Sequence, residues 1–398
     1  MGLGKTYTGS EKMVQLGASI NLVVCQKSKI DDWCSHIYSN YRKKFIVFDL
    51  TKKAQYTDFF NGIYGGYDVV GVINYELLWR RSELAKLKDF TLMLDESSLI
   101  QNEKSKRSKF ILKQLKPANV ILLSGTPCAG KYEQLYSQLK LLGMKMTKTA
   151  FYNTYIEYHY EDYVGFPLLV IDGYKNVDRL KKKMREYGCH FLKTDEVIDL
   201  PEQIFTEVKV KPSREYKRFK KDRVVDVGET TLIGDNTLTK MLYERQLCSV
   251  YSKDKLAAFK DLVESTEDRL IVFYNFTSEM EELREIVDKL ERPYSIVNGQ
   301  IKALTNYEYY GNSVTFIQYV AGSMGLNLQK SNKIIYYSPP LSSELYEQSK
   351  KRTNRIGQTK TCYYYNLIVT GSIEEKIYET LAMRRDYTNR LFEESEDE

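Results

Sequence analysis

The stretch Phe90 to Asn102, FTLMLDESSLIQN, decides the fold class that we expect for this chain. Its first five residues are typical of a buried strand, and they lead directly into two carboxylates, Asp95 and Glu96. Ligands of open parallel sheets bind beyond the carboxyl ends of the strands, where an acidic pair can hold Mg²⁺ and orient a water molecule. The stretch therefore points to phosphoryl chemistry. A strand followed by a solvated acidic turn is the plainer alternative, so the interpretation depends on partners elsewhere in the chain.

Short apolar runs alternate with helical or turn segments on both sides of this stretch. The first half carries them at 20–24, 45–48, 69–73, 90–94 and 120–123, and the second half at 270–273, 294–297, 314–317, 334–337 and 364–368. Runs rich in Val, Ile and Leu that alternate with helices predict parallel sheets covered on both faces. We therefore expect an α/β protein of two lobes, 1–200 and 201–398.

The alternation stops in three places. Aromatic and lysine-rich segments predict a helical insertion at about 144–200, and residues 213–249 predict helices with a mobile polar interruption at 227–236. Ser372 is a plausible N-cap for a charged helix that extends to about Phe392. The last six residues, EESEDE, predict a disordered acidic tail.

Composition excludes several classes of protein. The 398 residues suffice for two or three domains, and two is the more economical number. No apolar run approaches the roughly 18 residues of a membrane span, and the start lacks the cationic and apolar segments of a secretory signal. Six scattered cysteines without a CxxC pair, and only three histidines, favour reduced thiols in a cytoplasmic setting and argue against a zinc site. The net charge of +6 permits a polyanionic partner.

The first residues, Met-Gly-Leu-Gly-Lys5-Thr6, precede a helical stretch that reaches about Leu16. A glycine loop that ends in Gly-Lys-Thr at a helix N-terminus is the second half of a phosphate cradle. Its backbone N–H groups surround the phosphates, its lysine reaches the β and γ oxygens, and its threonine binds Mg²⁺. The full pattern GxxxxGK[ST] would begin two positions before Met1. An isolated GKT is often a chance match, but its position ahead of the Asp-Glu strand end favours a phosphate site.

The second half carries AGSMGLNL at 321–328 after a strand, and QSKKRTNRIGQ at 348–358. Arg352 and Arg355 are three residues apart, so on a helix they would lie on one face and point at the same anion. A second lobe that offers arginines to a nucleotide held by the first can stabilise a γ-phosphate in transfer. A basic helix end is the alternative.

With these motifs in order, the chain resembles the superfamily 2 helicases, and among them the Swi/Snf-type ATP-dependent DNA translocases in a minimal, phage- or bacterial-like form. The segments that carry the resemblance are MGLGKT (1–6, the end of motif I), VVCQKSKIDDW (23–33), VINYELL (72–78), DESS (95–98), LLSGTP (122–127), FLKTDEVIDLPEQ (191–203), IVFYNFTSEMEEL (271–283), AGSMGLNL and QSKKRTNRIGQ. The fragment RIGQ is the most specific to the family.

The resemblance implies two RecA-like lobes with ATP and Mg²⁺ between them and double-stranded DNA lying across both. It assigns catalytic roles to Asp95, Glu96, Arg352 and Arg355, with Glu96 as the general base. It assigns the nucleotide to Gly2, Gly4, Lys5, Thr6, Gly325, Asn327 and Gln348, and Mg²⁺ to Thr6 and Asp95. It assigns nucleic-acid contacts to Asn74, Tyr75, Ser124, Thr126, Asn275 and Ser323.

The resemblance implies an ATP hydrolase that moves on double-stranded DNA in replication, repair or recombination, in the cytoplasm of a bacterium or of a phage-infected host. Contacts would be mainly to phosphates, hence independent of sequence and sensitive to salt. An unwinding helicase is a second hypothesis, whose wedge would lie within 144–199. A catalytically weak nucleic-acid-binding remnant is a third, because the start of the phosphate loop is missing. RNA is less favoured, since RIGQ is typical of the DNA branch.

Overall fold

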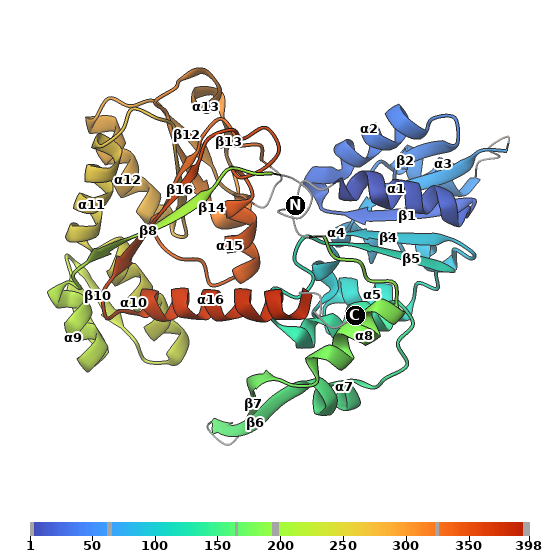
Figure 1. Ribbon diagram of the computed structural model, residues 1–398, viewed down its shortest axis with the longest axis horizontal. Coiled ribbons are helices and arrows are strands. Elements are labelled where there is room, and N and C mark those ends of the chain that lie inside the picture. The colour runs from blue at the N-terminus through green and yellow to red at the C-terminus, as the bar shows by residue number, and fades with distance from the viewer. Residues whose placement is uncertain (1–3, 62–65, 164–165, 193–198, 323–325, 393–398) are drawn as a thin grey trace. The chain divides into compact units, whose positions relative to one another are not determined.

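The structure, a computed structural model, describes residues 4–61, 66–163, 166–192, 199–322 and 326–392. The chain divides into two compact units, of which the first comprises Met1–Lys193 with Asp386–Glu398 and the second comprises Thr194–Arg385. Each unit is built on a sheet of its own (Figure 1). The sequence placed the lobe boundary at 200 and the whole C-terminal helix in the second lobe, whereas the last turns of α16 (Ile373–Phe392) belong to the first unit. The predicted acidic tail lies outside the described residues.

The first unit contains a five-stranded sheet with strand order β2-β3-β1-β4-β5, in which every pairing is parallel. Its strands are β1 (Ile20–Cys25), β2 (Phe45–Asp49), β3 (Asp68–Asn74), β4 (Thr91–Asp95) and β5 (Asn119–Leu123). Its helices include α1 (Lys5–Leu16), α2 (Ile30–Tyr41), α3 (Lys53–Asn61), α4 (Tyr75–Leu78), α5 (Lys106–Lys113) and α6 (Leu135–Leu141). All five apolar runs predicted in the first half are strands, which confirms the predicted α/β class.

Both faces of this sheet are covered by helices. Successive residues of a strand point to opposite faces, so neighbouring side chains enter different clusters. Leu22 and Val24 of β1 pack in the cluster that holds side chains of α3 and α5. Val23 and Cys25 pack in the opposite cluster with side chains of α1 and α2. Figure 1 shows α1 and α2 on one side of β1 and β4, and α5 on the other. Continuous apolar runs such as Leu92–Leu94 are therefore buried on both sides.

The expected helical insertion is wrong in its middle part. The structure places α7 (Lys148–Tyr155) and α8 (Val177–Glu186) on either side of an antiparallel hairpin, β6 (Ile156–Tyr163) and β7 (Phe166–Tyr174) (Figure 1). Polar residues alternate with tyrosines along β6, which is the period of a strand rather than of a helix. Tyr158 and Ile171 turn one face of the hairpin toward the cluster formed by α6, α7 and α8.

The second unit contains a seven-stranded sheet with strand order β13-β12-β14-β11-β15-β16-β8, parallel except for the β12–β13 pairing. Its strands are β8 (Gln203–Val210), β11 (Leu270–Tyr274), β12 (Tyr294–Val297), β13 (Lys302–Ala303), β14 (Val314–Gln318), β15 (Lys333–Tyr336) and β16 (Cys362–Val369). The five predicted runs are again strands. The sequence missed β8, because most of this edge strand is exposed and it shows no apolar run.

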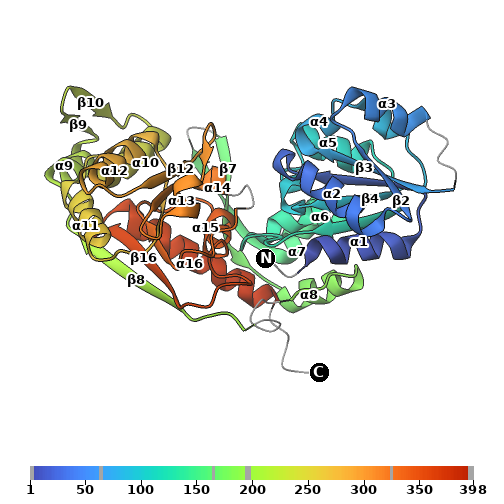
Figure 2. The same ribbon diagram turned by 90° about the horizontal axis from the view of Figure 1, so that it is seen from above.

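Helices cover both faces of the second sheet. They are α11 (Lys253–Glu264), α12 (Thr277–Lys289), α13 (Thr305–Tyr309), α14 (Tyr319–Gly322), α15 (Ser343–Lys350) and the first part of α16. Side chains of α11 and α12 pack in one cluster with Val272, and those of α15 and α16 pack in another with Phe273. Figure 2 shows α11 and α12 on one side of this sheet and α15 and α16 on the other. The predicted N-cap Ser372 accepts a hydrogen bond from the backbone N–H of Glu374 at 3.1 Å.

The stretch at 213–249 is a small subdomain beside this sheet. It comprises α9 (Arg214–Asp222), a hairpin of β9 (Val224–Val227) and β10 (Thr230–Ile233), and α10 (Thr237–Ser249). The polar interruption that we predicted to be mobile is thus largely the β9–β10 hairpin. Among the described residues, no helix combines the length and the apolar character that a membrane span requires.

Candidate functional site

The N-terminus of α1 provides backbone donors for an anion. Gly4 precedes the helix with φ 71° and ψ 23°, a left-handed conformation that glycine adopts without strain, and no side chain caps the helix. Within the helix, the first N–H groups have no carbonyl partner four residues earlier, and the backbone N–H of Thr8 is the first to bond back, to the carbonyl of Gly4 at 3.0 Å. The Gly-Lys-Thr segment therefore stands where the sequence predicted it, at a helix start suited to phosphate. The predicted Gly2 lies outside the described residues.

Lys5 of this first turn meets the acidic pair that ends β4. Its Nζ lies 3.1 Å from Oε1 of Glu96, and the two side chains keep exposures of 25% and 19%. Glu96 has φ 55° and ψ 60°, a left-handed conformation that is uncommon outside glycine and is often found at functional sites. Its other oxygen, Oε2, is buried and has no hydrogen-bond partner among the described residues. The structure thus brings together the two ends of the predicted phosphate site, and one carboxylate oxygen there has no partner among the described residues.

Asp95 is held from within the unit. The indole N–H of Trp33 in α2 donates to Oδ2 of Asp95 at 2.9 Å. Burial raises the pKa of the Asp95 carboxyl, and the nearby Glu96 adds to that, while the hydrogen bond from Trp33 and the charge of Lys5 oppose it. Trp33 was recognised in the sequence only as part of a motif. Its role as a donor to Asp95 depends on a contact across 62 residues of sequence, for which no local pattern exists.

Asn74, the last residue of β3, and Tyr75, the first residue of α4, are predicted nucleic-acid contacts, and both are buried. Tyr75 is fully buried, and its hydroxyl donates to the backbone carbonyl of Asp95 at 2.9 Å. Asn74 is also buried and donates from Nδ2 to the carboxylate of Glu76 at 3.0 Å. Tyr75 therefore supports the acidic turn, which is formed by Asp95 and Glu96, from inside the unit instead of forming part of a surface.

The turn after β5 lies beside the acidic turn, because β4 and β5 are neighbours and Asp95 pairs with Leu123. In this turn the hydroxyl of Ser124 accepts a hydrogen bond from the backbone N–H of Thr126 at 3.1 Å. The hydroxyl of Thr126 is buried and has no partner among the described residues. The two predicted nucleic-acid contacts Ser124 and Thr126 thus follow the strand next to the predicted catalytic acids.

The predicted arginines of the second unit do not share a helical face. Helix α15 ends at Lys350, and the chain then turns, so that Arg352 is buried while Arg355 is partly exposed. The backbone carbonyl of Arg352 accepts from the N–H of Leu328 at 3.1 Å. The guanidinium of Arg355 donates to the side-chain carbonyl of Asn327. These two hydrogen bonds join the predicted motifs 321–328 and 348–358, and both are made by residues of the turn that follows α15.

The remaining predicted residues of the second unit have internal roles or fall outside the description. Gln348 is buried and donates to Glu344 at 3.2 Å, one helical turn away. The side-chain amide of Asn275 donates to the hydroxyl and the carbonyl of Ser338 at 2.8 and 3.3 Å, which fixes the loop after β15. Gly325 and Ser323 lie outside the described residues.

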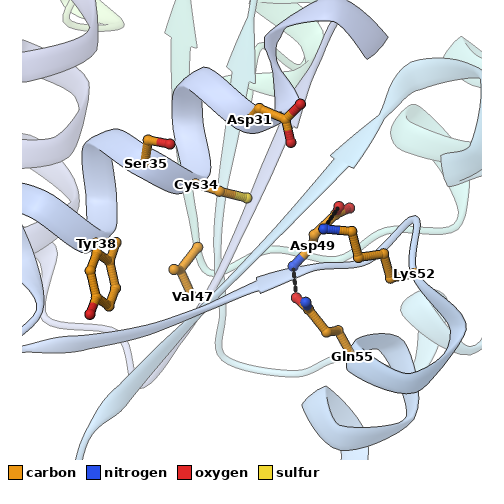
Figure 3. A pocket seen from close by; sticks show the side chains of 8 residues that line it. All are labelled: Asp31, Cys34, Ser35, Tyr38, Val47, Asp49, Lys52 and Gln55. Atoms are coloured by element: carbon orange, nitrogen blue, oxygen red, sulfur yellow. Dashed lines mark hydrogen bonds and ion pairs between the residues drawn. The ribbon is translucent and has the colours of Figure 1, made fainter.

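A hollow of about 270 Å³ lies elsewhere on the first unit, between α2 and the end of β2. Figure 3 shows Cys34 and Asp31 on the helix and Asp49 with Lys52 across from them. Nζ of Lys52 lies 3.2 Å from Oδ2 of Asp49. Burial raises the pKa of the Cys34 thiol to about 11, so this cysteine stays protonated at neutral pH. No residue of the predicted site lines the hollow, and we assign it no role in the chemistry.

The residues around α1 and β4 fit a nucleotide phosphate with a divalent cation. The helix start offers backbone donors, Lys5 offers a positive charge, and Thr6 in the same turn offers a hydroxyl. Asp95 and the unmatched oxygen of Glu96 offer the carboxylate oxygens that Mg²⁺ and an attacking water require.

Comparisons with known proteins show the family of this chain. Residues 1–253 match the family model described as SNF2-related domain, and residues 254–357 match the helicase conserved C-terminal domain. The chain is 22% identical over 433 residues to the putative ATP-dependent helicase/translocase YwqA of Bacillus subtilis, covering 99% of this chain and 46% of that protein. It is 23% identical to the ISWI chromatin-remodeling complex ATPase ISW1 of Saccharomyces cerevisiae, covering 95% of this chain and 37% of that protein. The chain thus spans less than half the length of these curated relatives.

Among solved structures, the Sulfolobus solfataricus SWI2/SNF2 ATPase core in complex with dsDNA matches 97% of this chain and 86% of its own. The TM-score is 0.41 and the sequence identity is 20%.

Proposed function

Because the chain belongs to the SNF2-related family, we propose that it hydrolyses ATP and uses the reaction to move along double-stranded DNA. The observation that carries this proposal is the contact between Lys5, at the donor-rich start of α1, and Glu96, at the end of β4. The relatives YwqA and ISW1 are named as an ATP-dependent helicase/translocase and an ATPase. The cellular setting that we propose is cytoplasmic, in replication, repair or recombination.

Each residue of the first unit has a distinct part in the proposal. The N–H groups at the start of α1 and the ammonium of Lys5 bind phosphate oxygens, which draws Lys5 away from Glu96. Glu96 then orients a water molecule and accepts its proton, while Trp33 and Tyr75 keep the acidic turn in place. Asp95 and Thr6 would hold Mg²⁺, which supplies neutralising charge at the phosphate oxygens when bound. Arg352 and Arg355 are proposed to meet the γ-phosphate.

DNA binding is proposed to rest on phosphate contacts. The turn Ser124–Pro127 offers small polar groups beside the catalytic acids. Helix α9 buries Tyr216 and Phe219, and cations outnumber the carboxylates Glu215 and Asp222 among its other residues. The exposed cations of this helix and its C-cap that belong to no ion pair among the described residues are Arg214, Lys217, Arg218, Lys220, Lys221 and Arg223. Such a surface favours a polyanion and predicts binding that weakens as salt rises.

The test is the rate of phosphate release from ATP with and without duplex DNA. We expect duplex to raise the rate, and Glu96→Gln to lower it by about 10²-fold to 10⁴-fold, the usual contribution of a general base. Glu186→Gln is the matched control, because Glu186 is an exposed residue of α8 paired with Lys183. A folded wild-type protein whose rate ignores duplex would contradict the proposal. DNA binding without hydrolysis would favour the nucleic-acid-binding remnant.

A further inference from the structure

One buried side chain outside the predicted motifs joins the acidic turn to the turn after β5. Gln138 of α6 accepts a hydrogen bond through Oε1 from the hydroxyl of Ser97 at 2.8 Å. Its Nε2 donates to the backbone carbonyl of Pro127 at 2.7 Å. Ser97 and Gln138 are both nearly inaccessible to solvent, with exposures of 1% and 5%. Nε2 also donates to the backbone carbonyl of Gln134 at 3.5 Å, one helical turn earlier, and the two shorter bonds join the amide to two different segments.

The two partners stand next to residues that the proposed function uses. Ser97 directly follows Glu96 and begins the short 3-10 helix Ser97–Ile100. Pro127 directly follows Thr126, a proposed nucleic-acid contact. One side chain thus connects the residue after the general base to the residue after the proposed DNA contact.

The orientation of the Gln138 amide is fixed by its partners. A backbone carbonyl only accepts hydrogen bonds, so the NH₂ group must face Pro127 and the amide oxygen must face Ser97. The hydroxyl of Ser97 must then donate to that oxygen. Because the Gln138 side chain is buried, breaking either bond leaves one polar atom of its amide without water to replace the lost partner. A displacement of one turn is therefore transmitted to the other instead of being absorbed between them.

A displacement at Ser97 can change the conformation of the acidic turn. Glu96 has a left-handed backbone, and the hydroxyl of Tyr75 donates to the backbone carbonyl of Asp95. A small rotation at Ser97 would change the direction of the Glu96 carboxylate, whose Oε2 has no partner among the described residues.

We propose that Gln138 is a positioning residue that couples occupation of the Ser124–Pro127 turn by DNA to the orientation of Glu96. The inference rests on the proposed function. DNA phosphates at Ser124 and Thr126 shift the carbonyl of Pro127, Gln138 follows it, and Ser97 moves with Gln138. Stimulation of hydrolysis by DNA then depends on the two hydrogen bonds of one glutamine.

The test compares Gln138→Met and Ser97→Ala with the wild type. Methionine keeps the length of glutamine and removes both hydrogen bonds, whereas Ser97→Ala removes one hydroxyl and serves if the first variant does not fold. Ser137→Ala is the matched control, because Ser137 is the buried neighbour on α6 whose hydroxyl has no partner among the described residues. The readout is the ratio of the hydrolysis rate with saturating duplex to the rate without it, together with a thermal melt.

We expect the ratio to fall by about fivefold or more in both variants, within the usual range of coupling between sites. The double variant should fall no further than the single ones, since both changes remove the same connection. Ser137→Ala should keep the wild-type ratio. A folded Gln138→Met variant that duplex stimulates as strongly as it stimulates the wild type would overturn this inference alone. A wild type that duplex does not stimulate would overturn the proposed function and the inference together.

Discussion

The two units each contain a lysine–glutamate ion pair, and the two pairs differ in burial and in hydrogen bonding. In the first unit, Lys5 and Glu96 form a pair that is partly open to solvent, and one oxygen of Glu96 has no partner among the described residues. In the second unit, Lys255 of α11 and Glu374 of α16 are 0% and 1% exposed, with Nζ at 2.6 and 2.7 Å from the two carboxylate oxygens. Glu374 also accepts the backbone N–H of Val369 at 3.0 Å. Both carboxylate oxygens of Glu374 are bonded, and we expect the Lys255–Glu374 pair to stabilise the fold. Oε2 of Glu96 has no partner among the described residues, and we expect the Lys5–Glu96 pair to serve the reaction instead.

The arginines of the second unit show the same contrast. The guanidinium of Arg292 makes five hydrogen bonds, all to backbone carbonyls, of Val263, Thr266, Asp268 and, twice, Asn312. Arg355 is partly exposed and donates to Asn327. Arg292 therefore closes loops at the amino ends of the strands, whereas the guanidinium of Arg355 stays near the surface.

The largest effect on stability is expected at the buried pair. Lys255→Met leaves Glu374 as a buried charge without its counter-ion, which should destabilise the second unit by about 3–5 kcal/mol. Chemical denaturation followed by circular dichroism measures this loss. Lys260→Met on the same helix is the control, because Lys260 belongs to an exposed pair with Glu264 at 3.6 Å and should change stability by less than about 1 kcal/mol. Equal losses in the two variants would break the comparison.

Arg292 should give the next largest effect. Arg292→Met removes a charged donor from several buried carbonyls, and we expect a loss of about 2–3 kcal/mol in the free energy of unfolding. Lys289→Met, at the exposed end of α12, is the control. ATP hydrolysis per folded molecule should stay unchanged in Arg292→Met. A drop in hydrolysis without a drop in stability would place Arg292 in the chemistry instead.

Glu96 should behave in the opposite way. Glu96→Gln keeps the shape of the side chain and loses only a partly exposed ion pair, so the free energy of unfolding should change by less than about 1 kcal/mol. The same variant is expected to lose hydrolysis, as proposed above. Thermal denaturation of the variant and the wild type measures the difference. A large loss of stability would mean that the Lys5–Glu96 pair is structural, like Lys255–Glu374.

The smallest effect concerns His159 on the exposed face of β6. Hydrogen bonds from its ring to Asp172 at 2.8 Å and to Glu161 at 3.3 Å raise the pKa of His159 above its ordinary value of 6.5. Because the folded state favours the protonated ring, this contribution to hairpin stability is fully present below about pH 6.5 and is lost as pH rises through the raised pKa.

An NMR titration of the His159 ring measures this pKa. The midpoint should lie above 6.5 in the wild type and should fall in Asp172→Asn. Since Glu161 also hydrogen-bonds the ring and raises its pKa, some upward shift should persist in the variant. A wild-type midpoint at or below 6.5 would show that these carboxylates do not hold the ring.

The sequence was informative where local pattern and tertiary environment agree. Parallel strands buried on both faces are continuous apolar runs, so β4 and its neighbours could be predicted, and with them the acidic pair at the end of β4. The hairpin β6–β7 and the edge strand β8 could not be predicted in the same way, since exposed or half-exposed strands carry polar residues. The helical face expected for Arg352 and Arg355 failed because α15 ends before them.

The supporting residues of the site were beyond reach of the sequence. Trp33 meets Asp95 and Gln138 meets Ser97 across 62 and 41 residues of chain. Such contacts depend on which strand ends and helices become neighbours in the fold, and no spacing in the chain encodes them. The predicted motifs contain the groups that we propose to react, whereas the side chains that contact those groups are seen only in the structure.

Movement along duplex DNA is the central claim, and displacement of a third strand tests it most directly. A labelled triplex-forming strand is placed on a duplex, and its release is followed with ATP in the wild type and in Glu96→Gln. We predict ATP-dependent release by the wild type and none by the variant. Hydrolysis of ATP on this substrate with no release of the third strand would contradict the account.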